Sequence, residues 1–239
     1  MATTMGTGRT ESERGSQTLA RGLSILGALR DAPQGLSVAE LVRQLGLHRP
    51  IVTRLLATLE DEHYVERSGS RAYRLGPELI ALGKAVRSDL RDVAHTTLRT
   101  LAEQIRATVV LVLRDRDHAV VISVVEPTST DLRLSFRLGS RHVLRQGAEG
   151  MAILAGNPPL RGERGEVAAA RQAGYVVSSG EIMPGTWGLA VPVRTSDGPC
   201  EMSIGVIAAQ ALDEPAAARL VQHAAYELGE RLSLTDDLD

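Results

Sequence analysis

In this 239-residue chain, the residues best suited by type and spacing to bind a ligand are arginines that lie in a stretch without acidic residues. Arg43, Arg49 and Arg54 lie within residues 43–59, where the sequence contains no Asp or Glu. A solvated helix face usually mixes both signs of charge, whereas a face with cations alone suits the phosphate-lined grooves of a duplex. The chemistry predicted here is therefore recognition of double-stranded DNA.

Two short helices joined by a tight turn would present these arginines. Apolar residues recur at helical spacing over 38–45 and again over 52–59, so each segment has one stripe to bury. Ser37 suits the cap of the first helix, Gly46 its left-handed end, and Pro50 the first turn of the second helix. The pattern predicts a helix-turn-helix whose second helix enters the major groove. From these residues alone, a plain antiparallel helix pair in a bundle remains the alternative.

The residues expected to contact DNA lie on the open face of the second helix and around it. Pro50 cannot donate a hydrogen bond, Ile51 suits contact with a thymine methyl, and the arginines suit guanine or phosphate. The predicted set is Arg21, Arg43, His48, Arg49, Pro50, Ile51, Thr53, Arg54 and Arg71.

The flanking segments favour a winged form of this motif. Leu and Ile residues over 16–31 predict a third helix, and 64–76 predicts a hairpin with a glycine turn that carries Arg71 at its tip. A basic hairpin directly after a helix-turn-helix is typical of a wing. We therefore assign 16–76 to a winged helix-turn-helix domain, preceded by a disordered tail over 1–15.

In the rest of the chain, the pattern of apolar residues predicts a helical linker over 77–106 and a second domain over 107–239. Strands are predicted over 109–113, 119–125, 132–136, 188–194 and 202–208, and helices over 148–155, 166–173 and 213–232. Because no regular β-α-β crossover repeat appears, we expect an α+β fold with an antiparallel sheet and helices on one side.

Composition narrows the classes of function. The net charge of -2 gives the whole molecule no general affinity for nucleic acid, so DNA contact must come from a local patch. Aromatic residues, at 3%, are too sparse for single-strand binding by base stacking. A single cysteine, Cys200, excludes an intramolecular disulfide and a cysteine-based zinc site. Without a signal peptide or a membrane-length apolar run, we expect a cytoplasmic protein that binds no membrane, metal or cofactor.

No set of residues in the sequence forms a catalytic motif. The six histidines are scattered, and no zinc-protease motif, nucleophile elbow or phosphate-binding loop occurs. Glu149 and Glu181 could face one cavity, which leaves a small-molecule enzyme as a remote alternative. We expect no enzymatic activity.

The helix-turn-helix and two stretches of the second domain together resemble the IclR family of bacterial transcription regulators. Residues 139–155, GSRHVLRQGAEGMAILA, are similar to the family pattern G-x-R-x-P-L-H-x-T-A-x-G-K-A-x-L-A. Residues 174–193 are similar to G-[YW]-A-x-D-x-x-E-x-x-x-G-x-x-x-[IV]-A-x-P-[VI]. The resemblance covers nearly the full chain. It implies a GAF-like effector domain that binds a small molecule, often a carboxylate or aromatic acid, in a homodimer or dimer of dimers that represses or activates at a pseudo-palindromic operator.

The resemblance also implies where the effector binds. The site residues carried over are Gly147, Ala148, Ser178, Thr186, Gly188, Gly205 and Ile207. Family members often have hydroxyl residues where this chain has Gly147, Gly205 and Ile207, whereas backbone N–H groups at a helix start still suit a carboxylate. We therefore expect an effector more apolar than a two-carbon acid. The alternative is a degenerate, ligand-free domain that serves only for dimerisation.

Overall fold

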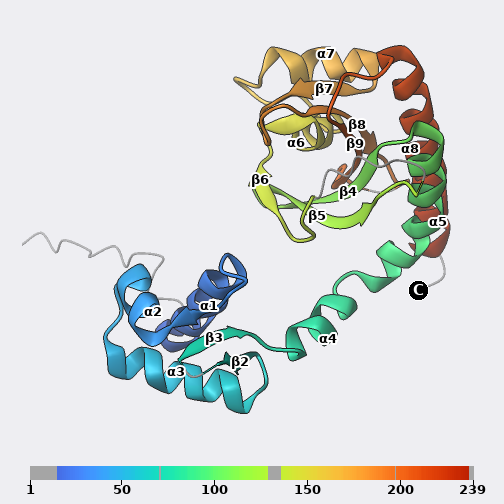
Figure 1. The fold of residues 1–239 in the computed structure, drawn as a ribbon. Coiled ribbons are helices and arrows are strands. Elements are labelled where there is room, and N and C mark those ends of the chain that lie inside the picture. Colours follow the sequence, from blue (N-terminus) through green and yellow to red (C-terminus); the bar gives the residue numbers. More distant parts are fainter. Residues whose placement is uncertain (1–14, 70, 129–135, 197, 237–239) are drawn as a thin grey trace, which may run out of the picture. The chain divides into compact units, whose positions relative to one another are not determined.

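The computed structural model describes residues 15–69, 71–128, 136–196 and 198–236 (Figure 1). They form two units, divided between Val86 and Arg87. The tail expected over 1–15 lies outside the described residues except for Gly15, and so does most of the strand expected over 132–136.

Helices and a small sheet make up the first unit, as the winged helix-turn-helix prediction requires. The helices are α1 (Gln17–Arg30), α2 (Val38–Leu45), α3 (Arg49–Asp61) and α4 (Glu78–Ala85), and the strands are β1 (Leu36–Ser37), β2 (Val65–Ser68) and β3 (Ala72–Leu75). Strand β1 was not predicted. It pairs antiparallel with β3, in the sheet order β1-β3-β2, and so ties the hairpin to the start of α2.

Local sequence explains why α2 begins and ends where it does. Ser37 and Glu40 form a capping box, in which each side chain accepts a hydrogen bond from the other residue's backbone N–H. Gly46 then adopts a left-handed conformation, with φ 65°, and its N–H donates to the Val42 carbonyl. The turn between α2 and α3 is therefore short and defined by backbone geometry.

Helix α1 packs through its C-terminal part. Ile25 and Leu29 are buried in the core of the first unit, as the helical pattern predicts. Leu19 and Leu23, which share that pattern in the sequence, are 62% and 57% exposed. The buried residues of α1 are Gly22, Ile25, Ala28 and Leu29, so Leu19 and Leu23 lie outside its buried face.

The second unit is a six-stranded antiparallel sheet with helices. Its strands are β4 (Thr108–Asp115), β5 (His118–Val125), β6 (Arg141–Val143), β7 (Val176–Ser179), β8 (Trp187–Val193) and β9 (Met202–Ala208), and its helices are α5 (Ser88–Ile105), α6 (Gly147–Ala155), α7 (Gly165–Ala173) and α8 (Glu214–Asp236). The strand order is β6-β5-β4-β9-β8-β7. The edge strands β6 and β7 were not predicted, because each is short and has only a few apolar residues.

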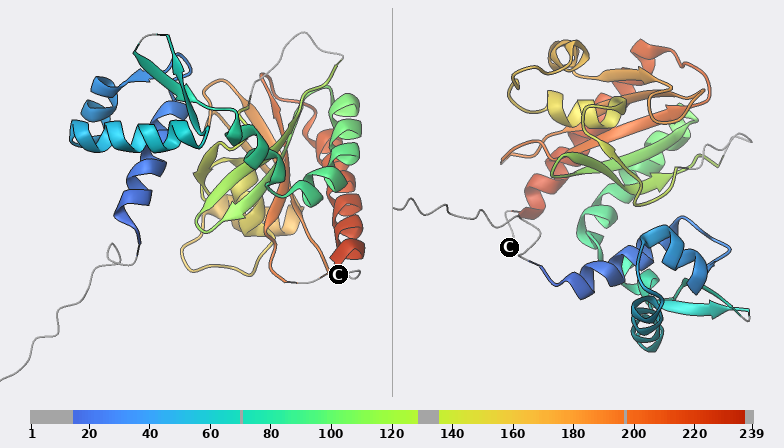
Figure 2. Two further views of the ribbon diagram at one scale, coloured as in Figure 1. Left: turned by 90° about the horizontal axis from the view of Figure 1, so that it is seen from below. Right: turned by 90° about the vertical axis from the view of Figure 1, so that its left-hand side faces the viewer.

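Helices cover both faces of this sheet, so the prediction of helices on one side was wrong (Figure 2). Helices α5 and α8 lie side by side on one face, and α6 and α7 pack on the other. Successive side chains of a strand point to opposite faces. In β4, Val109 and Leu111 accordingly enter the core under α5 and α8, whereas Val110 and Val112 enter the core under α6.

The segment expected to be a linker is divided between the units. Helix α4 belongs to the first unit and α5 to the second, and Arg87 between them has a left-handed φ of 48°. Leu90, Leu98 and Leu101 of α5 are buried in the core of the second unit. The second half of the expected linker is therefore part of the sheet domain.

Helix α8 is the last described element, and its inner face contributes Val221 and Leu228 to the core that it shares with α5. Several residues outside this face, among them Arg219, His223 and Glu227, are exposed and polar or charged. Neither α8 nor any other helix among the described residues has the length and apolar content needed to cross a bilayer.

Gly76 should be essential for the first unit, because it follows β3 where the hairpin closes onto the end of α3. Its N–H donates to the Tyr64 carbonyl at 2.8 Å, and a Cβ at this position would lie 2.1 Å from the carbonyl oxygen of His63. We expect Gly76→Ala to destabilise the first unit by about 2 kcal/mol or more, measured by thermal denaturation. Gly27→Ala on α1 is the matched control, since a Cβ there meets nothing within 4 Å. Equal melting curves for the two variants would contradict the expectation.

Candidate nucleic-acid interface and the site at the start of α6

Helix α3 has one buried face and one open face. Val52, Leu55 and Leu56 are buried in the core of the first unit. The exposed residues of α3 from its start to Thr58 are Arg49, Pro50, Thr53, Arg54, Ala57 and Thr58. The helix therefore presents short side chains between two arginines, as a helix that enters a groove requires.

Four of the arginines predicted to contact DNA lie outside the ion pairs of the described residues. Among the residues that the structure describes, no ion pair engages Arg43, Arg49, Arg54 or Arg71, and all four are exposed. Other arginines of this unit do pair: Arg67 Nε lies 3.0 Å from a carboxylate oxygen of Glu60, and Arg74 pairs with Glu66 on the neighbouring strand. Among the described residues of this unit, the arginines outside any ion pair thus lie on α2, α3 and the hairpin, apart from Arg21 on α1.

A groove of about 470 Å³ lies between the start of α2, the start of α3 and the hairpin. Its lining residues are Ser37, Val38, Ala39, Arg49, Arg67, Arg71, Ala72 and Tyr73. Arg67 also lies over the Tyr73 ring, 5.4 Å from its centroid. The groove combines a helix N-terminus with three guanidinium groups, which suits phosphate. Sequence reasoning did not include Arg67 and Ser37 in the interface, although Ser37 with Glu40 is a recognisable capping box.

The remaining predicted DNA contacts are less uniform. His48 is exposed at the N-cap of α3, and its side chain makes no cap hydrogen bond. Ile51 is half-buried and packs against the core of the first unit, so only part of it is available to a base. Arg21 is half-buried on α1 and does not line the groove of Arg49 and Arg71.

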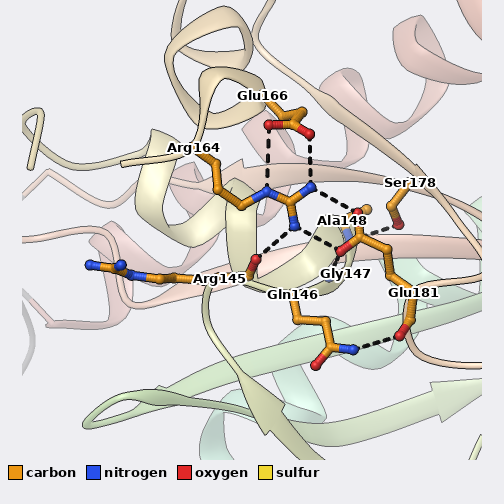
Figure 3. Close-up of polar contacts among 8 residues, drawn as sticks. All are labelled: Arg145, Gln146, Gly147, Ala148, Arg164, Glu166, Ser178 and Glu181. Atoms are coloured by element: carbon orange, nitrogen blue, oxygen red, sulfur yellow. Dashed lines mark hydrogen bonds and ion pairs between the residues drawn. The ribbon is translucent and has the colours of Figure 1, made fainter. Parts of the chain in front are cut away.

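In the second unit, the first N–H groups of α6 are bonded to side chains of the chain itself (Figure 3). The Gly147 N–H donates to a carboxylate oxygen of Glu181 at 3.0 Å, and the Ala148 N–H donates to the Ser178 hydroxyl at 3.0 Å. Gly147 has a left-handed φ of 77°, which lets the helix begin against the turn that carries Glu181. The donors predicted for an effector carboxylate therefore already have acceptors.

Arg164 fixes Glu181 in this position. Its guanidinium donates to both carboxylate oxygens of Glu181, at 3.0 and 3.1 Å, and also to Glu166 (Figure 3). Hydrogen bonds from Arg164 are the main reason why the pKa of Glu181 lies below its usual value. A further bond joins the Gln146 amide to the Glu181 carbonyl at 2.6 Å. Glu181 is therefore ionised and held from three directions.

Glu149 lies in the same first turn of α6 and is 5% exposed. Its carboxyl group lies against β9: a Cβ at Gly205 would be 2.6 Å from Glu149 Cγ and 2.8 Å from Oε1. A Cβ at Gly147 would be 3.4 Å from the other carboxyl oxygen. Burial raises the pKa of Glu149 to about 6, and its own backbone N–H lowers it in part. Sequence reasoning did not identify Glu149 as a neighbour of Gly205.

Most of the residues predicted for the effector site come together here. Gly188 lies near both Ser178 and Ala148, at 3.5 and 3.8 Å from its Cβ position, and it is paired with Ile207 across β8 and β9. Ile207 is 3% exposed in the core under α6. Thr186 is directed elsewhere, because its hydroxyl donates to the Met183 carbonyl in the preceding turn.

Two family models match the chain in the order of these two units. The IclR helix-turn-helix domain matches residues 18–69, and the bacterial transcriptional regulator IclR C-terminal domain matches residues 83–164. The chain belongs to the IclR family. Its α+β fold, with a winged helix-turn-helix before a curled antiparallel sheet, is the fold of this family.

Relatives agree with this assignment. The HTH-type transcriptional regulator Rv1719 of Mycobacterium tuberculosis is 38% identical over 151 residues, which cover 63% of this chain and 58% of the relative. The chain matches less than three-fifths of the length of this relative, and the same holds for TtgV of Pseudomonas putida and KipR of Bacillus subtilis.

Solved structures of IclR proteins match nearly the whole chain. A regulator from Alicyclobacillus acidocaldarius has a TM-score of 0.77 at 25% identity, covering 90% of this chain and 98% of that one. An IclR homologue from Microbacterium hydrocarbonoxydans, solved with 4-hydroxybenzoate, has a TM-score of 0.75 at 22% identity and covers 90% of this chain and 99% of its own. IclR proteins are transcriptional regulators and not enzymes. Glu149 and Glu181 are the two carboxyl groups on which the alternative of an enzyme rested. In the structure Glu149 is buried, and Glu181 is paired with Arg164.

The raised pKa of Glu149 predicts a pH-dependent stability. The pKa rises from 4.5 to about 6 on folding, so its protonation stabilises the fold below pH 4.5 and this contribution is lost as the pH rises through about 6. We expect Glu149→Gln, which cannot ionise, to be more stable than the parent above that range by about 2 kcal/mol. The two proteins should converge below pH 4.5.

Thermal denaturation across this range measures the difference between the two proteins. Glu230→Gln on α8, at an exposed position, is the matched control and should track the parent at every pH. A constant gap between Glu149→Gln and the parent would contradict a titration of Glu149.

Proposed function

We propose that this protein binds double-stranded DNA through α3 and the β2–β3 hairpin and regulates transcription in the cytoplasm. The observation that carries the proposal is the set of exposed arginines on α2, α3 and the hairpin that form no ion pair among the described residues. A protein with a net charge of -2 needs such a local patch to approach phosphate. Membership of the IclR family supports the same function.

The contacts to DNA would be of two kinds: contacts to phosphates, which position the protein on the duplex, and contacts to base edges, which read the sequence. Arg49, Arg67 and Arg71 border the groove at the start of α2, which suits a phosphate of the DNA backbone. Arg54 and Thr53 lie further along the open face of α3, where side chains can reach base edges in the major groove. Arg43, His48, Pro50 and the exposed part of Ile51 would lie at the margin of this surface, and Arg21 would contact a phosphate from α1.

The assembly would be a homodimer or a dimer of dimers on a pseudo-palindromic operator. Two copies related by a twofold axis place two α3 helices in successive major grooves, so half-site spacing reports the dimer geometry. The exposed Leu19 and Leu23 of α1 are an apolar pair on this unit that such an assembly would have reason to cover.

The second unit would control operator affinity by binding a small organic effector. Support comes from the convergence of Gly147, Ala148, Ser178, Gly188, Gly205 and Ile207 near the start of α6. A homologue of the same fold was solved with 4-hydroxybenzoate, an aromatic acid. The alternative is a ligand-free dimerisation unit, which is favoured by the bonds that Glu181 and Ser178 already make to the N–H groups of α6.

Selection of duplexes from a random pool by the purified full-length chain tests the DNA-binding proposal. We expect enrichment of a two-part sequence whose half-site centres lie about one helical turn, or a multiple of it, apart. A pool without enrichment, at a salt concentration where non-specific binding is weak, would contradict the proposal. A thermal-shift screen of small acids and aromatic compounds then tests the effector, because a ligand that binds only the folded state raises the melting temperature.

Arg54→Ala should weaken binding to the selected duplex by about 1–3 kcal/mol. If Arg54 reads a base, the loss should fall on one position of the half-site; if it contacts a phosphate, the loss should be uniform and the salt dependence shallower. Gel-shift titration at several salt concentrations measures both effects. Arg30→Ala is the matched control, because Arg30 is exposed in the same unit and paired with Asp31 at 3.0 Å. Unchanged affinity in Arg54→Ala would exclude Arg54 from the interface.

A further inference from the structure

The side chain of Glu149 lies between α6 and β9 in the second unit. Glu149 reaches from the first turn of α6 across to Gly205, and its Cγ and Oε1 occupy the volume next to the glycine where any other residue would place a Cβ. Its second carboxyl oxygen lies close to Gly147 at the helix start. Gly147 and Gly205 are both residues predicted to bind the effector, so the carboxyl group of Glu149 lies inside the predicted site.

The surroundings of this carboxyl group are those of a bound acid. Glu149 is 5% exposed and lies in the layer where Ala148, Met151 and Ile207 are buried. Its own N–H at the start of the helix lowers its pKa in part, but burial is the larger influence and favours the neutral acid. The neighbouring N–H groups of Gly147 and Ala148 have Glu181 and Ser178 as acceptors. Side chains of the chain therefore occupy three consecutive N–H groups of α6.

We propose that Glu149 is a built-in ligand of the second unit, which takes the place of a small carboxylate between α6 and β9 and excludes free ones. The exclusion has two physical causes. The site has no room for a second carboxyl beside that of Glu149, and a second negative charge beside a buried acid is repelled. Glu149 thus sets the class of effector: the parent protein does not bind small monocarboxylic acids at this position. This inference rests on the proposed function only in that the site is called an effector site; the binding of carboxylates beside Glu149 can be tested without it.

Truncation of Glu149 to alanine gives a direct test. The change removes one methylene group and the carboxyl group, which together are the heavy atoms of acetate. Glu149→Ala should therefore bind sodium acetate at least tenfold more tightly than the parent, and acetate should raise its melting temperature.

The full-length proteins are compared by calorimetry and thermal shift, with sodium chloride at equal ionic strength as the reference. Glu149→Gln keeps the space filled and should not bind acetate, and Glu230→Ala, the same truncation at an exposed position of α8, should behave as the parent does. The proposal is overturned if the parent binds acetate as tightly as Glu149→Ala does, or if Glu149→Ala does not bind acetate.

A measurement on the parent keeps the proposal testable if Glu149→Ala does not fold. The backbone amide signals of Gly147, Ala148 and Glu149 should not move when acetate is titrated into the parent protein, and saturable shifts there would overturn the exclusion. None of these measurements involves DNA. A failure of this inference is therefore distinct from a failure of the proposed DNA-binding function, which would appear in duplex selection.

Discussion

The close approach of α6 to the sheet is the constraint on which the second unit depends. Helix α6 is buried along its whole length, and it lies over strands that have glycine at Gly188 and Gly205. A Cβ at Gly205 would overlap with Glu149, so the small residue on the strand and the large residue on the helix are matched. Because β4 and β9 present their alternate side chains to the α5–α8 layer, the sheet is held between two cores and cannot shift away from α6.

The same approach decides the chemistry at the start of α6. A helix N-terminus leaves backbone donors that need acceptors, and in a buried position an acceptor is required for each of them. Glu181, Ser178 and Glu149 supply these acceptors from the turn after β7, from β7 and from the helix itself. Arg164 neutralises the charge of Glu181, whereas Glu149 has burial as the leading influence and a pKa raised to about 6. Two carboxyl groups near one glycine therefore have pKa values shifted in opposite directions because of their different surroundings.

In the first unit, backbone geometry orients the predicted DNA-binding surface. The left-handed Gly46 ends α2, the pairing of β1 with β3 ties the hairpin to the start of α2, and Gly76 lets the hairpin close on the end of α3. Each feature acts on the backbone, so the arginines on α3 and the hairpin can be exposed without contributing to the core. Arg67 and Arg74 do form ion pairs. Arg67 pairs with Glu60 and so joins the hairpin to α3, and Arg74 pairs with Glu66 on the neighbouring strand of the hairpin.

Much of this protein follows from the sequence alone, because the periodicity of apolar residues and the capping residues are local signals. They predicted the helix-turn-helix around Gly46, the hairpin that carries Arg71, and strands β4, β5, β8 and β9, and the motifs over 139–155 and 174–193 indicated the family. Only the tertiary structure decided which faces of the sheet are covered, where the linker joins the second unit, and that Glu149 lies against Gly205. These features depend on contacts between residues far apart in the chain, and neither helix packing nor the filling of a cavity leaves a periodic pattern in a single sequence.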